Sequence, residues 1–362
     1  MKIALVIYGS LDTLSGGYLY DRKLVGELRA AGCTVDIISL PWRNYAAHLT
    51  DNVGGAWRNH LFTGDYDLIL QDELNHPSLF LYNRVLRRRV QSPLVAIVHH
   101  LRSEEDHPPL LRRIYDLIET AYLRSVDGFI FNSVTSRRVV TARRPTPAPS
   151  IIAYPAADHI APPTTAAIHH RIQERRHNNG PLRCLFVGNL SPRKALHTVL
   201  DALARLPAHS WQLDVVGSIT VDSAYAQSVM RRAYHSFAPG AVTWHGRVND
   251  DELRACYLNA DLFVAPSYEG FGIVYLEAMA FGLPVIASTA GAAHEIVTPH
   301  QNGYLVPPDD SAGLATRLDE LRNNRTQWAE MAVAARARYE SHGTWQSNFA
   351  PAIIWLREIT KR

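Results

Sequence analysis

Short apolar runs alternate with amphipathic stretches through both halves of the chain. The apolar runs cover residues 3–9, 34–40, 67–73, 93–100, 127–133, 149–159, 183–190, 211–217, 241–248, 261–267, 283–288 and 303–308. The amphipathic stretches cover 18–31, 78–90, 108–125, 192–205, 222–237, 249–259, 272–281, 292–297 and 311–322. Buried strands separated by helices are typical of parallel sheets with helices on both faces. The pattern predicts an α/β protein of two similar doubly wound halves, with ligands at the carboxyl ends of the strands and a cleft between the halves.

A proline-rich segment interrupts this alternation near the middle of the chain. Six prolines lie between Pro145 and Pro163, and a polar run follows them. Such a segment is typical of a connection between domains. We therefore expect a first domain over 1–160, a connection over 161–181 with some helix near 165–176, and a second domain over 182–343. A helical tail is expected over 325–360.

Composition narrows the protein class. The chain has 362 residues, 47% hydrophobic and 20% charged, with a net charge of +3, which is too small to indicate nucleic-acid binding. The three scattered cysteines fit no disulfide framework, so a reducing cytoplasm is expected. The N-terminal run indicates a buried strand rather than a signal peptide, and no run approaches the ~18 apolar residues of a membrane span. Arginine pairs in the first half indicate a solvated face, with peripheral contact to anionic lipid as the alternative.

The stretch 263–288 concentrates the features of a ligand site. A strand-like run leads into a loop with Glu269, Gly270 and Gly272, and a helix is expected to begin near Gly272. The first amides of a helix have no partner within it and suit a phosphate. Glu277 follows inside the helix, so the two acids could hold different parts of one ligand. A turn without a ligand, with Glu277 as a helix-surface acid, fits these residues equally well.

A second candidate loop follows the run at 183–190. Arg193 and Lys194 lie at the expected start of a helix, where two cations oppose the helix dipole and a bound anion would remove that cost. Gly188 allows a ligand to approach the backbone. A solvated Arg–Lys pair is an equal alternative.

The first half has two further candidates. Gly16 and Gly17 lie between the first run and a helix, as in a phosphate- or sugar-binding turn, but the glycine spacing of a dinucleotide-binding motif is absent. His99 and His100 end the run at 93–100, at the sheet edge where ligands bind, with a structural role as the alternative. The sequence has no His/Cys/Asp cluster with metal-ligand spacing and no nucleophile elbow.

Together these motifs resemble those of retaining glycosyltransferases of family 4, also known as group 1, which have the GT-B fold of two Rossmann-like domains facing across a cleft. The family signature is a pair of glutamates separated by seven residues in the context EGFG-x4-EAMA-x-G-x-PVIA, and residues 269–287 match it closely. Further similarity lies in VGNLSPRKAL at 187–196, AGAAHEIV at 290–297 and NGYLVPPDD at 302–310. The resemblance covers most of the second domain and is looser in the first.

The resemblance implies donor-binding roles in the second domain. Glu269 would contact hydroxyls of the donor sugar, Glu277 would accept hydrogen bonds from the ribose hydroxyls, and Lys194 matches the phosphate-binding lysine of the family. Asn189 stands where the family often has Arg, and Arg193 is the candidate to supply that charge. The loop and helix residues expected to contact the sugar and diphosphate are Gly270, Phe271, Gly272, Ile273 and Val274.

In the first domain, Gly16 and Gly17 would line the diphosphate and His99 would contact the transferred sugar. His99, Glu269 and Lys194 are therefore the expected catalytic residues. Loops 42–45 and 101–105 are the candidates for acceptor recognition. The helix at 344–362 resembles one that crosses back to the first domain in this family.

The implied reaction is transfer of a sugar, with retention of configuration, from a nucleotide-diphosphate donor to a glycan, lipid or small-molecule acceptor. A UDP-sugar is favoured over GDP-mannose. Neither a metal nor a cofactor is expected, because Lys194, Arg193 and the helix start would stabilise the departing diphosphate. A non-hydrolysing sugar-nucleotide epimerase of the same architecture and an inactive sugar-nucleotide-binding protein are the alternatives.

Overall fold

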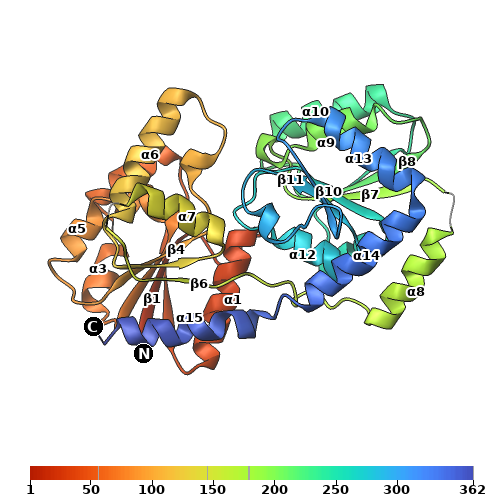
Figure 1. Cartoon of the computed structure of the whole chain (residues 1–362). Helices are drawn as coiled ribbons and strands as arrows, with labels where there is room; N and C mark the ends of the chain where they lie inside the picture. Colours follow the sequence, from red (N-terminus) through yellow and green to blue (C-terminus); the bar gives the residue numbers. More distant parts are fainter. Residues whose placement is uncertain (56, 145, 178–179, 362) are drawn as a thin grey trace. The chain divides into compact units, whose positions relative to one another are not determined.

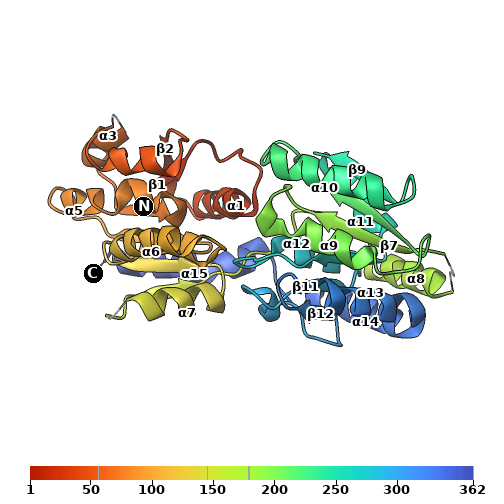
Figure 2. The same ribbon diagram turned by 90° about the horizontal axis from the view of Figure 1, so that it is seen from above.

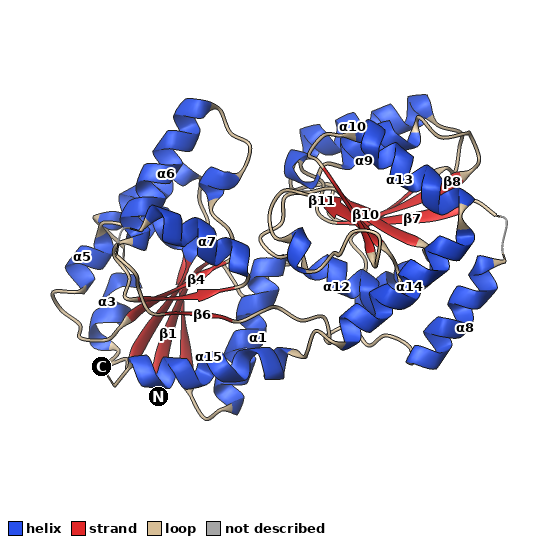
Figure 3. Ribbon diagram, viewed as in Figure 1, coloured by secondary structure: helices blue, strands red, loops and turns tan. Residues whose placement is uncertain are grey.

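The computed structural model describes residues 1–55, 57–144, 146–177 and 180–361. The chain divides into two compact units. The first consists of Met1–Pro155 with Thr344–Arg362, and the second of Ala156–Gly343. Each unit contains a six-stranded parallel sheet surrounded by helices (Figures 1 and 3). The predicted α/β architecture with two Rossmann-like sheets is therefore confirmed.

The sheet of the first unit has the order β2-β1-β3-β4-β5-β6. Its strands are β1 (Lys2–Tyr8), β2 (Thr34–Leu40), β3 (Leu68–Asp72), β4 (Leu94–Val98), β5 (Gly128–Phe131) and β6 (Ser150–Ile152). The central strands β3, β4 and β5 are buried at every residue, in keeping with the continuous apolar sequences of β4 and β5, whereas β3 ends in the buried polar residues Gln71 and Asp72. The strand order reverses between β1 and β3, so the loops after these strands flank the point where ligands bind in open sheets.

The helices of the first unit differ in places from the sequence prediction. They are α1 (Gly16–Ala30), α2 (Tyr45–Leu49), α3 (Trp57–Thr63), α4 (His76–Leu79), α5 (Tyr82–Leu86), α6 (Pro109–Leu123), α7 (Val134–Arg143) and α15 (Trp345–Ile359), with 3-10 turns η1 (Thr50–Asn52), η2 (Glu73–Asn75) and η3 (Arg102–Glu104). The single helix expected over 78–90 is wrong, since α4 and α5 are separate short helices. The prediction also missed α2, α3 and α7. The residues of α7 are mostly polar or β-branched and give no clear apolar stripe in the sequence. The main local feature that favours this helix is its N-cap, Ser133, whose hydroxyl accepts a hydrogen bond from Ser136 N.

The C-terminal helix α15 belongs to the first unit, as the blue helix among the red-to-yellow elements in Figures 1 and 2 shows. Its Trp345 and Phe349 rings pack against Tyr20 of α1, with ring centroids 6.1 and 4.9 Å away. The Arg357 guanidinium donates to the carbonyl of Ala31 over 2.6 Å. Phe349 is fully buried. These contacts make the last helix part of the core that covers α1.

The sheet of the second unit has the order β12-β11-β10-β7-β8-β9. Its strands are β7 (Leu182–Val187), β8 (Trp211–Val216), β9 (Val242–Gly246), β10 (Leu262–Ala265), β11 (Val285–Ser288) and β12 (Gly303–Val306). Starting from β7, this is the strand order of a dinucleotide-binding fold, with the reversal between β7 and β10. The loops after β7 and β10 therefore flank its ligand-binding point.

The helices of the second unit are α8 (Thr165–Arg176), α9 (Leu196–Leu203), α10 (Ser223–Ser236), α11 (Asp250–Asn259), α12 (Ile273–Ala280), α13 (Ser311–Asn323) and α14 (Arg325–Glu340), with 3-10 turns η4 (Pro192–Lys194) and η5 (Ala293–Glu295). Helix α8 occupies part of the expected connection and is docked onto this unit, because Arg171 donates to the carbonyls of Leu258 and Ala260 over 2.7 and 3.1 Å. The helix expected over 292–297 is wrong, since only the turn η5 forms there. Among the described residues, no helix has the length and apolar character needed to cross a bilayer.

Candidate functional site

The loops after β7 and β10 bring a lysine and a glutamate together at the strand-order reversal of the second sheet. Lys194 Nζ donates a hydrogen bond to Glu269 Oε1, and the Ser267 hydroxyl donates to the same oxygen over 2.8 Å. Arg193 Nη1 lies 3.8 Å from the other carboxylate oxygen. Burial alone would raise the pKa of Glu269, but Lys194 and Arg193 outweigh it and hold the pKa at about 2. Glu269 is therefore ionised at neutral pH, and these three sequence-predicted residues form one cluster.

A break in the backbone places Lys194 in this cluster. The continuous helix expected over 192–205 is wrong at its start, because η4 forms first and Ala195 takes a left-handed conformation with φ of 54° before α9 begins. The two cations therefore lie in the turn that precedes the helix. The Lys194 side chain lies over Gly188, where a Cβ would come within 3.4 Å of Lys194 Cδ. Arg193 Nη1 donates to the carbonyl of Tyr268 over 2.7 Å, so both cations are directed at the β10 loop.

The backbone of Glu269 is fixed by Gly291, in the loop after β11. Ala292 N donates to the carbonyl of Glu269 over 2.9 Å, and a Cβ on Gly291 would lie 2.2 Å from that oxygen. Gly291 also has φ of 74°, which disfavours any other residue. The AGAAHEIV segment of the family resemblance thus holds the acidic loop in place.

Helix α12 begins directly after the loop that carries Glu269. Gly272 is its N-cap with φ of 97°, and a Cβ there would lie 2.3 Å from the ring of Tyr275. The first amides of the helix, those of Ile273 and Val274, have no partner within the helix. This end of α12 therefore adds hydrogen-bond donors and partial positive charge beside Lys194 and Arg193.

Glu277 lies one turn further along α12 in a different environment. It is only 6% exposed, so it is not an ordinary helix-surface acid. Its Oε2 accepts a hydrogen bond of 2.8 Å from the Tyr257 hydroxyl, and its Oε1 lies 3.1 Å from His159 Nε2. Burial raises the pKa of Tyr257 well above its usual value, so the phenol stays a donor. Tyr257 and His159 were not singled out from the sequence, and a ribose hydroxyl bound by Glu277 would share the carboxylate with them.

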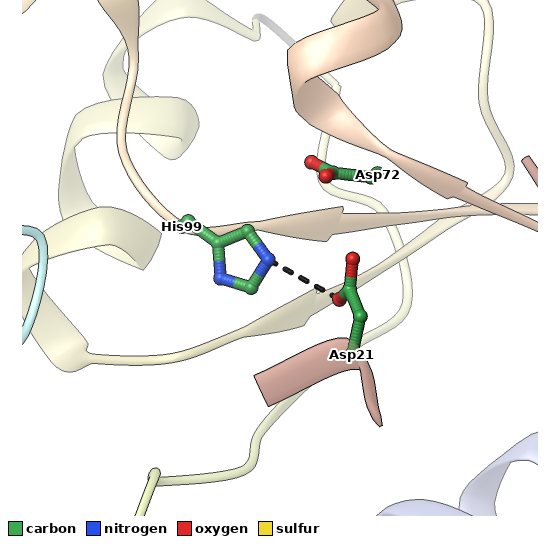
Figure 4. Close-up of side chains that lie close together, drawn as sticks. All are labelled: Asp21, Asp72 and His99. Carbon is green, nitrogen blue, oxygen red and sulfur yellow. Dashed lines mark hydrogen bonds and ion pairs between the residues drawn. The ribbon is translucent and has the colours of Figure 1, made fainter. Parts of the chain in front are cut away.

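In the first unit, His99 follows β4 and lies beside two buried aspartates (Figure 4). His99 Nε2 is 3.3 Å from Asp21 Oδ1, and polar side-chain atoms of Asp21, Asp72 and His99 all lie within 4.8 Å of one another. Gly17, in the first turn of α1, leaves room for the ring, since a Cβ there would come 3.3 Å from His99 Cδ2. Gly16 is the first residue of the same helix. The structure thus brings the predicted Gly17 and His99 together.

Asp21 and Asp72 were not predicted from the sequence as site residues. A usable signal existed for Asp72, because it ends β3, which pairs with β4 so that Asp72 lies opposite Ile97. Residues at the ends of paired parallel strands meet at one sheet edge, as His99 and Asp72 do. Asp21 gave no comparable signal, since an acid within a helix usually faces solvent.

The two candidate acceptor loops also meet in the first unit. The Arg102 guanidinium lies over the rings of Tyr45 and Tyr115, 5.4 and 4.9 Å from their centroids. The Tyr45 hydroxyl is 3.0 Å from His76 Nε2. His100 Nε2 lies 2.9 Å from Glu105 Oε1, in the second of these loops. The Arg102 guanidinium therefore joins loops 42–45 and 101–105 by packing on the half-buried Tyr45 and the buried Tyr115.

Comparison with known proteins extends these observations. Residues 169–338 match the family model described as glycosyl transferases group 1. A glycogen synthase of Mycobacterium tuberculosis is 35% identical over 181 residues, which are 48% of this chain and 42% of that protein. A phosphatidyl-myo-inositol mannosyltransferase of Mycobacterium leprae is 26% identical over 94% of this chain and 93% of that protein. The chain spans less than half the length of the glycogen synthase it matches. Residues 169–338 are therefore similar to group 1 glycosyl transferases, and the mannosyltransferase is similar along nearly the whole chain.

Solved structures share the fold. The sucrose-phosphate synthase of Thermosynechococcus elongatus has a TM-score of 0.84 and 22% identity, covering 99% of both chains. The Anabaena protein HepE in complex with UDP-glucose has a TM-score of 0.73 and 19% identity, covering 100% of both chains. At these sequence identities, the similarity establishes the two-domain α/β fold of the GT-B type. It does not identify the substrates of this chain.

Proposed function

We propose that the chain is a retaining glycosyltransferase that moves a sugar from a nucleotide-diphosphate donor to a glycan, lipid or small-molecule acceptor without a metal ion. The observation that carries the proposal is the cluster of Lys194, Arg193 and Glu269 beside the start of α12, at the strand-order reversal of the second sheet. The family match over residues 169–338 supports it. A UDP-sugar is the favoured donor, which the UDP-glucose complex of the similar HepE protein supports, and GDP-mannose is the competitor.

The proposed chemistry follows the charge that develops during transfer. The acceptor oxygen forms a bond to the anomeric carbon, the bond from that carbon to the diphosphate oxygen breaks, and the hydroxyl proton leaves with the products. Negative charge therefore grows on the departing diphosphate. Lys194, Arg193 and the first amides of α12 would stabilise it, and fixed donors in a partly buried site are more effective than water. In this proposal they take the place of a metal ion.

Glu269 has a separate role in this proposal. A carboxyl group whose pKa is about 2 keeps no proton to donate at neutral pH. It is also a weak base, so it is suited to accept hydrogen bonds from sugar hydroxyls rather than to transfer a proton. Glu269 would orient the sugar while it holds Lys194 in place. Glu277, with Tyr257 as a fixed donor, would bind the ribose.

The decisive experiment pairs binding with product analysis. A thermal-shift panel of nucleotides and sugar nucleotides should show stabilisation by one nucleoside diphosphate and its sugars, because a ligand of the native state raises its stability. Lys194→Met should lose most of that shift, whereas Arg231→Met, which removes an exposed cation of α10, should keep it. With the preferred donor and an acceptor library, the glycoside should retain the donor's anomeric configuration by NMR. An inverted product, an epimerised donor formed without acceptor, or binding without turnover of any acceptor would contradict the proposal.

The acceptor would be selected by the half-buried Tyr45 and Arg102, which pack over the buried Tyr115. Tyrosine rings stack on sugars, and an arginine held over them offers donors to hydroxyl or phosphate oxygens. Tyr45→Ala should raise the KM for the acceptor and leave the KM for the donor within about twofold, since ring stacking contributes about 1 kcal/mol or more to binding. A larger effect on the donor than on the acceptor would contradict this assignment.

Peripheral membrane contact is assigned to α6. Leu110, Ile114 and Leu117 are 73, 42 and 70% exposed and recur on one face of the helix, next to the exposed Arg112 and Arg113. An exposed apolar stripe beside arginines is suited to anionic lipid.

Vesicle sedimentation tests this contact. The protein should bind vesicles that contain an anionic lipid and not neutral ones, and Leu110→Gln/Leu117→Gln should abolish binding. Ile354→Gln, which replaces a 60% exposed apolar residue of α15, is the matched control. Equal binding by both variants would show that α6 is not the contact.

A further inference from the structure

A row of three polar side chains, each from a different element, lies at the carboxyl edge of the first sheet. Asp21 comes from α1, Asp72 ends β3 and His99 follows β4. Asp21 Oδ1 is 3.3 Å from His99 Nε2, and Asp72 lies beside Asp21, on the side of the ring opposite its second nitrogen (Figure 4). Both aspartates are buried, at 0 and 2% exposure. The row is therefore built into the unit rather than formed at its surface.

One carboxylate oxygen of Asp21 has no hydrogen-bond donor among the described residues. This oxygen, Oδ2, is buried. The carboxyl group of Asp72 is the neighbouring group that can supply a proton, because two buried carboxylates this close cannot both stay ionised at low cost. Burial and the charge of Asp21 raise the pKa of Asp72 to about 7. A protonated Asp72 would donate to Asp21 Oδ2 while its Oδ1 accepts from Leu74 N over 2.9 Å.

His99 is held from several sides. Its Nε2 faces Asp21, its backbone N–H donates to Glu73 Oε2 over 2.9 Å, and the Tyr20 ring meets it edge-on with centroids 5.1 Å apart. Its Nδ1 has no hydrogen-bond partner among the residues that the structure describes, and the side chain keeps 12% exposure. The free ring nitrogen is therefore available to a ligand, and Figure 4 shows it on the side away from the two aspartates.

The charges around His99 favour a protonated ring. Burial lowers the pKa of His99, but Asp21, Asp72 and Glu73 outweigh it and raise the pKa to about 9. Helices α1 and α6 also place three tyrosines nearby. Burial raises the pKa values of Tyr18, Tyr20 and Tyr122, so these side chains carry no charge at neutral pH. Glu119 of α6 has a pKa raised by burial to about 7 and accepts from Arg102 N and Ser103. His76, whose pKa burial lowers to about 3, is neutral.

We propose that Asp21 and Asp72 are positioning residues for His99, and that the row Asp72–Asp21–His99 presents His99 Nδ1–H as a hydrogen-bond donor to an oxygen of the transferred sugar. Asp72 donates to Asp21, and Asp21 accepts from His99 Nε2–H, so the second ring proton stays on Nδ1. Gly17 leaves space for the ring to keep this orientation. The inference rests on the proposed glycosyl transfer, in which His99 meets the sugar, and it defines His99 as a donor rather than a base.

Two substitutions separate the members of the row. Asp21→Asn removes the negative charge that faces Nε2, so the pKa of His99 should fall by about two units, toward its usual 6.5 or below. Asp72→Asn keeps a donor toward Asp21, so the His99 pKa should stay well above 6.5. Above its pKa of about 7, Asp72 of the wild type gains a negative charge that the Asn side chain cannot gain, so the basic limb of the pH profile of kcat should move to lower pH in Asp72→Asn. The matched control, Asp214→Asn, breaks a His–Asp pair of 2.6 Å in the second unit and should leave the His99 signals and the profile as in the wild type.

The primary measurement is a nitrogen-15 titration of the free protein, with the His99 signals identified by their loss in His99→Gln. The titration needs no substrate. A negative result for the role of the two aspartates can therefore be told apart from a failure of the proposed glycosyl transfer. The ring should be doubly protonated at pH 7 in the wild type and neutral in Asp21→Asn. In turnover, Asp21→Asn should lower kcat at least about tenfold with little change in the donor KM.

Three results would overturn the inference. One is a neutral His99 in the wild-type protein at pH 7. Another is a proton on Nε2 alone in every variant, because His99 would then be an acceptor at Nδ1. The third is saturable binding of Mn²⁺ or Zn²⁺ that both Asp21→Asn and Asp72→Asn abolish, because the three side chains would then be ligands of a cation.

Discussion

Replacement of Lys194 by methionine is the sharpest test of the charge cluster in the second unit. Glu269 is 13% exposed, and its pKa of about 2 lies below its usual 4.5 although burial acts in the opposite direction. The difference corresponds to about 3 kcal/mol of interaction that favours the ionised form in the native state. Because the native pKa is depressed, this contribution is complete above pH 4.5 and is lost as the pH falls towards 2.

Lys194→Met leaves Glu269 with Arg193 at 3.8 Å and the Ser267 hydroxyl at 2.8 Å. At pH 7 we expect the free energy of unfolding of the second unit to fall by about 3 kcal/mol, since removing one partner of a partly buried pair leaves an uncompensated charge. The double variant Lys194→Met/Glu269→Gln should recover most of the loss, because no charge then remains unpaired.

Urea unfolding followed by tryptophan fluorescence measures these changes, and Trp211 and Trp328 are buried reporters in the second unit. The difference between wild type and Lys194→Met should narrow between pH 4.5 and pH 3. A loss below about 1 kcal/mol at pH 7, or a double variant no more stable than Lys194→Met, would refute the electrostatic argument. The recovered double variant should still bind nucleoside diphosphate weakly, which separates the stabilising role of the lysine from its proposed role as a phosphate ligand.

Three further substitutions test other parts of the structure. Gly272→Ala should lower the melting temperature and the donor affinity, because the left-handed N-cap and the Tyr275 ring leave no space for a Cβ, and strain of this kind costs about 1–3 kcal/mol; wild-type melting would contradict this. Tyr257→Phe removes the donor to Glu277 Oε2 and should weaken nucleoside diphosphate binding by about 1 kcal/mol in calorimetry, whereas binding of free inorganic phosphate should not change. Phe349→Ala removes a fully buried ring and should destabilise the first unit by about 3–5 kcal/mol in hydrogen exchange while the second unit keeps its protection.

Much of the fold could be predicted from the sequence because it depends on local apolar patterning. Each of the twelve strands among the described residues overlaps a predicted apolar run, and only β1 and β7 begin one residue before theirs, since strands buried on both faces consist largely of apolar residues. The errors lie where capping or backbone strain decides the structure. At 192–205, the composition is helical throughout, but the left-handed Ala195 divides the segment and no local pattern announces it. Helix α2 depends on one cap, Asn44 Oδ1, which accepts from Ala47 N.

The candidate site was predictable where residues are close in sequence to a glycine-rich turn, as Glu269 and Lys194 are. Residues that join it only through tertiary packing were not predictable. Tyr257 lies on α11 and reaches Glu277 across the interior of the unit, and Asp21 reaches His99 from a helix far away in the sequence. In both cases the partner is a buried polar side chain that looks ordinary in its own segment. Such residues become visible only when the hydrogen bonds of each buried polar atom are accounted for.

The first unit is built from two segments that are far apart in the sequence, and this sets the order in which the protein can fold. Helix α15 packs against Tyr20, yet the ribosome makes it only after the whole of 156–343 has been synthesised. A nascent chain that ends at residue 343 can complete the second unit but not the first, whose α1 surface is still uncovered. The apolar surface around Tyr20 is therefore exposed for the time needed to translate an entire domain, and chaperones that recognise apolar segments have their longest opportunity there.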